Sequence, residues 1–90
     1  MADLNLHSRC KYEGKDPKKL QELEECNEAF EAIKVYLSNE LDGCGSNSKI
    51  FNFYVIADAI GLDEKVVSKA LSGGIESSIT LEKRENNTWS

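Results

Sequence analysis

The sequence predicts a mainly α-helical domain with a small β-hairpin at its end, built from three helices and two or three short strands. Three observations predict it: a long apolar stripe at helical spacing, two short helical segments on either side of Gly61, and an alternating segment near the C-terminus. A chain of 90 residues suits one core, because it is too short to bury two. We expect residues 1–15 to form an N-terminal arm or an edge strand, and residues 16–90 to form the domain.

The first helix is expected to begin at Asp16 and Pro17. The aspartate side chain can accept from the free amides of the first turn, and the fixed φ of proline suits the first helical position. Gly43 is a typical stop. An apolar stripe with spacings of three and four runs along this helix: Leu20, Leu23, Cys26, Phe30, Ile33, Leu37 and Leu41.

A helix of about 25 residues is about 35 Å long, more than the rest of a small domain is expected to cover. Two interpretations of the stripe stay open. The helix is either a core helix throughout, or its uncovered end is the seam of a homodimer formed through Pro17 to Leu41.

The cysteines and the N-terminal arm carry weaker patterns. Apolar residues at alternate positions from Leu4 to Tyr12 favour an extended strand, although a partly ordered arm fits equally well. Cys10, Cys26 and Cys44 are an odd set without a Cys-x-x-Cys pair or a second histidine. We therefore expect reduced thiols, and neither a metal site nor a cofactor.

Two further helices are expected in the second half. After a short strand at Lys49–Phe51, Asn52 is placed to cap a helix over Phe53–Ile60 that is apolar on nearly all sides and should be well buried. Gly61 breaks that helix. Asp63 can cap the next one, which runs to Leu71 or Ser72 and ends at a pair of glycines.

The last segment predicts a hairpin. Ile79 to Arg84 alternates like a half-buried strand, and residues 85–87 are a plausible turn into a returning strand that ends at Ser90.

The segment Phe53 to Gly74 resembles the helix-turn-helix of the Cro and phage-repressor families. Ala57 stands where only a small side chain fits between the helices, and Gly61 stands where the turn needs a left-handed conformation. The inner face of the second helix has the matching spacing, with Leu62, Val67 and Leu71. Together with the strands, this motif is similar to the winged-helix superfamily.

The resemblance implies that Asp63 to Ser72 is a recognition helix in the DNA major groove and that Ile79 to Ser90 is a wing. Lysines can meet guanine edges or phosphates, serines can meet several bases, and a glutamate can accept from cytosine. The implied DNA-binding residues are Glu64, Lys65, Ser68, Lys69, Ser72, Lys83 and Arg84. The two wing bases have a plainer alternative, as solvated charges that protect an edge strand.

The acidic net charge of the chain counts against strong DNA binding. The net charge is −5, but residues 1–47 hold ten acids against six bases, and residues 48–90 hold six against five. Any surface that faces DNA is therefore expected in the second half. Neither a secretory signal nor a membrane span is evident, which indicates a cytoplasmic protein without membrane contact.

Two functions stay open. One is a transcriptional regulator that binds double-stranded DNA as a homodimer, since one small helix-turn-helix contacts few bases. The other is a winged-helix protein-interaction module, an adaptor or phage-type inhibitor with little or no DNA binding, favoured by the acidic total and the Asp63-Glu64 pair. No nucleophile, base or phosphate-loop pattern indicates an enzyme.

Overall fold

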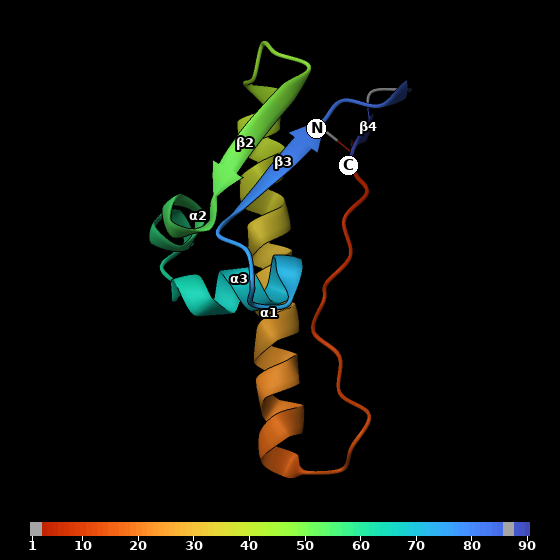
Figure 1. Cartoon of the computed structure of the whole chain (residues 1–90), viewed down its shortest axis with the longest axis vertical. Coiled ribbons are helices and arrows are strands. Elements are labelled where there is room, and N and C mark those ends of the chain that lie inside the picture. Colours follow the sequence, from red (N-terminus) through yellow and green to blue (C-terminus); the bar gives the residue numbers. More distant parts are fainter. Residues whose placement is uncertain (1–2, 86–87) are drawn as a thin grey trace.

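The computed structural model describes residues 3–85 and 88–90. The elements follow in the order β1 (Asp3–Leu4), α1 (Pro17–Asp42), β2 (Ser48–Asn52), α2 (Phe53–Ile60), α3 (Glu64–Ser72), β3 (Ser78–Glu82) and β4 (Thr88–Trp89). Figure 1 shows α1 as a long spine, with α2 and α3 packed beside its middle and the β2–β3 ladder beside its C-terminal half. The expected three helices and small antiparallel sheet are present, in a layout compatible with a winged helix.

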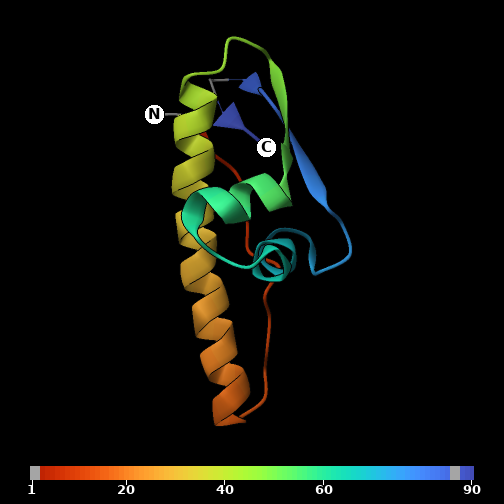
Figure 2. The same ribbon diagram turned by 90° about the vertical axis from the view of Figure 1, so that its left-hand side faces the viewer.

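Helix α1 has the bounds that its caps predict. The Asp16 carboxylate accepts a hydrogen bond from the Lys18 amide at 3.0 Å, and the Gly43 amide donates to the Leu41 carbonyl. The stripe is buried from Cys26 to Leu41, whereas Leu20 is 43% exposed. The N-terminal end of α1 projects beyond α2 and α3 (Figure 2), so this end of the stripe is uncovered, as the length of the helix predicts.

The α2–turn–α3 segment is built as its capping residues predict. The side chains of Asn52 and Asp63 accept hydrogen bonds from amides in the first turns of α2 and α3. Gly61 has φ +73° and Gly73 has φ +87°, in the left-handed region that favours glycine. Ala57 is buried between the helices, so the motif residues have the steric roles expected of them.

Two burial predictions for this segment are wrong. Helix α2 was expected to be buried on nearly all sides, but Tyr54 is 66% exposed and Val55 is 53% exposed. Leu62 was expected on the inner face with Val67 and Leu71, but it is 38% exposed. The reason is that α1 and α3 cover α2 from one side, and no further element lies over its other side among the described residues.

The core joins all three helices to the sheet. Its largest fully buried side chains are Ile33, Leu37, Phe53, Ile56, Val67 and Leu81. The Nζ atom of Lys49 on β2 lies 3.3 Å from a carboxylate oxygen of Glu40 on α1, which adds a polar contact at the edge of this core. Helix α3 is therefore held in place by the core, in which its residues Val67, Ala70 and Leu71 are buried.

The predicted hairpin is present in a short form, because Lys83, directly after β3, and Trp89 in the returning segment form an antiparallel bridge. Strand β3 pairs antiparallel with β2 over all five residues, from Ser48↔Glu82 to Asn52↔Ser78. The returning segment meets only the far end of β3. Glu82 and Ser90 exchange two backbone hydrogen bonds of 3.2 Å, and the Arg84 amide donates to the Thr88 carbonyl. Two residues of the predicted turn, Asn86 and Asn87, lie outside the described residues.

The N-terminal arm runs back along α1 (Figure 1). The alternation from Leu4 to Tyr12 is confirmed as an alternation of half-buried and exposed side chains, but only Asp3–Leu4 forms a strand, parallel to β4. The Arg9 amide donates to the Ala70 carbonyl at 2.9 Å, which ties the arm to α3. Both predicted forms of the segment are thus partly right: a short edge strand, followed by an extended arm.

The prediction of reduced cysteines is wrong for two of the three. Cys10 and Cys26 form a disulfide with their Cα atoms 6.5 Å apart, whereas Cys44 is free. The arm doubles back along α1 and brings Cys10 beside the buried stripe residue Cys26. Sequence spacing carries no signal for this pair, because the contact depends on the fold-back of the arm.

Candidate nucleic-acid interface

The outer face of α3 carries two lysines. Val67, Ala70 and Leu71 are buried against the rest of the domain, while Lys65 and Lys69 are exposed on the opposite side. These two residues are four apart, so they are neighbours on one face of the helix. The structure thus places together the two lysines that the sequence assigns to a recognition helix.

Unlike the two exposed lysines, the two serines of the predicted site use their hydroxyl groups in hydrogen bonds within the domain. Ser68 is only 8% exposed, and its hydroxyl donates to the Glu76 carbonyl at 2.8 Å. The Ser72 hydroxyl donates to the Ser68 carbonyl at 2.9 Å. The assignment of Ser68 as a base-contacting residue is therefore wrong: it follows Val67 and precedes Leu71 by three positions, which puts it on the inner face.

The start of α3 is acidic. The Asp63 carboxylate caps the helix, and Glu64 is exposed in the first turn. Both positions stabilise the helix, because acidic groups interact favourably with its N-terminal dipole. The same negative charges repel phosphate groups at this end of the helix.

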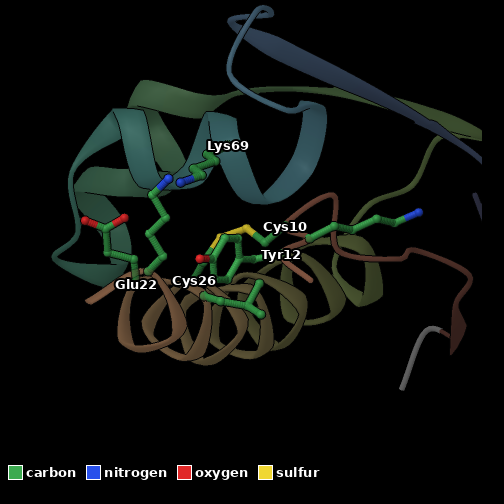
Figure 3. A pocket seen from close by; sticks show the side chains of 8 residues that line it. Cys10, Tyr12, Glu22, Cys26 and Lys69 are labelled. Carbon is green, nitrogen blue, oxygen red and sulfur yellow. A yellow bond between two sulfur atoms is a disulfide. The ribbon is translucent and has the colours of Figure 1, made fainter. Parts of the chain in front are cut away.

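Lys69 faces a hollow of about 180 Å³ between α3, the N-terminal half of α1 and the arm (Figure 3). Its lining residues are Cys10, Lys11, Tyr12, Lys19, Glu22, Leu23, Cys26 and Lys69. Lys11 and Lys19 thus line the same hollow as Lys69, although both belong to the acidic half of the chain. The sequence did not indicate them, because only the folded arm brings them there.

The acidic residues of α1 share this region. Glu22 and Glu25 line a second hollow together with Cys26, Val66 and Lys69. The surface in front of α3 is consequently mixed in charge, with lysines from three elements and carboxylates from α1.

The wing bases lie at the opposite end of the molecule. The Lys83 amide donates to the carbonyl of Asn47, in the loop that follows α1, and Arg84 Nε donates to the Ser90 hydroxyl. Cys26 on α1 lines the hollow next to Lys69, and Asp42 ends α1 just before the loop that contacts Lys83. At 1.5 Å per residue, Cys26 and Asp42 are about 24 Å apart along the helix. Lys83 and Arg84 therefore do not join Lys65 and Lys69 in one basic surface, as Figure 1 also shows by the position of β3 relative to α3.

Helix α2 presents an apolar outer face. Val55, Ala59 and Leu62 follow each other by four and three residues and are exposed, with Tyr54 beside them. The charged residue of α2 is Asp58. This face carries no base to contact a DNA backbone.

Other kinds of site find no support in residues 3–85 and 88–90. No group of three or more histidine, cysteine, aspartate or glutamate side chains is arranged to hold a metal ion there. Over the same residues, no helix is long and apolar enough to cross a membrane.

Comparison of the chain with protein-family models, with curated proteins and with solved structures gave no match in any of the three.

Proposed function

We propose that the protein binds double-stranded DNA through the outer face of α3. The observation that carries the proposal is that Lys69 on α3 shares a hollow with Lys11 on the arm and Lys19 on α1, while Lys65 lies four residues before Lys69 on the same helix. Phosphate contacts by lysine supply most of the affinity of small DNA-binding domains. The rigid α2–turn–α3 frame holds such a helix as a recognition helix requires.

In this proposal α3 enters the major groove with its lysine face, and Lys11 and Lys19 contact the backbone beside it. The wing end with Lys83 and Arg84 stays off this duplex, because it lies at the other end of α1. Glu64 keeps affinity modest because it repels phosphate, and the lysine contacts make binding sensitive to salt.

The predicted homodimer through α1 does not form part of the proposal. At the N-terminal end of the stripe Leu20 is exposed and Leu23 is half-buried, and both line an open hollow with Glu24, Glu28 and Glu31. Packing of two copies along this strip collects six carboxylates in one seam, which is unfavourable. We therefore propose that a single chain contacts DNA.

Binding of short duplexes, followed by fluorescence anisotropy at low salt, tests the proposal. Lys65→Ala/Lys69→Ala is expected to weaken binding roughly 10- to 100-fold, because two phosphate contacts are lost. Lys83→Ala/Arg84→Ala removes the same charge at the far end and is expected to bind like the wild type. Equal binding by all three proteins, or a loss confined to the second variant, would contradict the proposal.

A second candidate function is favoured by the apolar outer face of α2. Exposed Tyr54, Val55 and Leu62 gather around Asp58, and contiguous exposed apolar surface marks protein-interaction sites. Its occupant would be an apolar segment of another protein with a basic residue opposite Asp58, by charge complementarity.

A nuclease-treated pull-down with matched variants tests this second function. Val55→Asp is expected to lose a stoichiometric partner that both the wild type and the control Ile75→Asp retain, since Ile75 is 92% exposed elsewhere, in the α3–β3 connection. Retention of the same partner by Val55→Asp counts against a docking site on α2.

A further inference from the structure

The hollow in front of Lys69 has an unusual charge for this acidic protein. Three lysines and one glutamate line it, so its formal charge is +2 in a chain of net charge −5. Among the described residues, none of the three lysines forms an ion pair. The Nζ atom of Lys19 lies 5.7 Å from the centre of the Tyr12 ring. An anion in the hollow would offset the repulsion between these ammonium groups.

The size and chemistry of the hollow suit a tetrahedral oxyanion. At about 30 Å³ per water molecule, a volume of about 180 Å³ holds one phosphate group together with a few waters. The ammonium groups of Lys19 and Lys69 and the Tyr12 hydroxyl can donate hydrogen bonds there, and lysine contacts phosphate as a point charge.

One side of the hollow is held by a covalent bond. Lys11 and Tyr12 follow Cys10 directly, and the disulfide from Cys10 to Cys26 fixes them against α1. Two hydrogen bonds also hold this part of the arm: the Arg9 amide donates to the Ala70 carbonyl, and the Asp16 amide donates to the Tyr12 hydroxyl at 3.2 Å. Without the disulfide, Cys10 and Lys11 between these two bonds have no covalent tie to the floor of the hollow.

We propose that this hollow is an oxyanion site that the Cys10–Cys26 disulfide assembles, so that its affinity depends on the redox state of the chain. The inference rests on the proposed function to the extent that the oxyanion is a backbone phosphate of DNA; free phosphate has the same chemistry. Reduction by a dithiol transfers two electrons and two protons to the two sulfurs. The S–S bond breaks, Cys10 and Cys26 become thiols, and the reductant closes its own disulfide.

Titration of the full chain with inorganic phosphate, followed by amide chemical shifts in NMR, tests the site itself. Lys69→Gln is expected to weaken phosphate binding about tenfold, the effect of losing one hydrogen bond to a charged group. Lys34→Gln is the matched control, because Lys34 lies on α1 over the Phe30 ring and outside the hollow. Unchanged affinity in Lys69→Gln, or an equal loss in the control, overturns the site.

The redox dependence is tested by the same titration after dithiol reduction and in Cys10→Ser/Cys26→Ser. Both are expected to bind phosphate about tenfold more weakly than the oxidised chain, since the arm no longer fixes Lys11. Equal affinity in the oxidised and reduced chain overturns the role of the disulfide. If either form unfolds, Lys11→Gln in the oxidised chain replaces it: the same loss supports the proposal, and unchanged affinity overturns the assignment of Lys11.

A parallel titration with duplex DNA separates the two sources of oxyanion. Redox-dependent binding of both probes identifies the ligand as a backbone phosphate. If phosphate binding depends on the redox state but duplex binding does not, the ligand is free phosphate. Phosphate binding without any duplex binding leaves the oxyanion site standing and overturns the proposed function.

Discussion

Replacing Phe53 by alanine is expected to destabilise the protein by about 3 to 5 kcal/mol. Phe53 is fully buried at the start of α2, where that helix joins β2. Its amide also donates to the Ser77 carbonyl, so the site lies between the sheet and the helices. A domain of this size is stable by only about 5 to 13 kcal/mol, so the loss is a large fraction of the total.

Urea denaturation followed by the fluorescence of Trp89 measures the effect, because the chain has one tryptophan and it is buried. Tyr54→Ala is the matched control: it truncates the neighbouring aromatic residue, which points to solvent, and is expected to change stability by less than about 0.5 kcal/mol. If Phe53→Ala does not fold, Phe53→Leu is expected to show a smaller loss. Equal effects of the Phe53 and Tyr54 substitutions would contradict the described core.

Removing the disulfide is expected to cost about 3 kcal/mol, because a loop of about this length restricts the unfolded chain by that amount. Cys10 and Cys26 are separated by 16 residues. The measurement is the urea midpoint of Cys10→Ser/Cys26→Ser against the oxidised wild type, without reductant in either sample.

Cys44→Ser serves as its control, since Cys44 is the free cysteine. This variant is expected to unfold at the wild-type midpoint. A double variant as stable as the wild type would show that the arm is held by its noncovalent contacts, such as the Arg9 amide on the Ala70 carbonyl, rather than by the sulfur bridge.

The helices could be predicted from the sequence because their ends are encoded locally. Asp16, Asn52 and Asp63 each cap a helix, and Gly61 and Gly73 each adopt the left-handed conformation that ends one. These are contacts between residues two to four positions apart, so the sequence contains both partners of each.

The parts that could not be predicted depend on contacts between distant segments. The full-length pairing of β3 with β2 depends on the position in which α3 leaves the chain. The disulfide and the approach of Lys11 to Lys69 depend on the arm doubling back along α1. One face of α2 is exposed because no element among the described residues packs over it, and hydrophobic periodicity alone does not reveal this.

These differences change where on the molecule the DNA interface is expected. The sequence divided its basic candidates between a recognition helix and a wing, both in the less acidic half of the chain. The fold instead places Lys11 and Lys19 from the acidic half around a hollow with Lys69 and Glu22, and it places Lys83 near the C-terminal end of α1. Net charge by halves of the sequence was therefore a poor guide to the charge of the folded surface.

The salt dependence of duplex binding tests the central claim most directly, because its slope counts the phosphates that lysines contact. With four lysines at the interface, log K is expected to fall with log salt at a slope of about −3 to −4, and Lys65→Ala/Lys69→Ala is expected to reduce that slope by about 2. Lys83→Ala/Arg84→Ala is expected to leave the slope unchanged. A slope that falls only in the Lys83 and Arg84 variant, or binding that shows no salt dependence, would contradict DNA recognition by the outer face of α3.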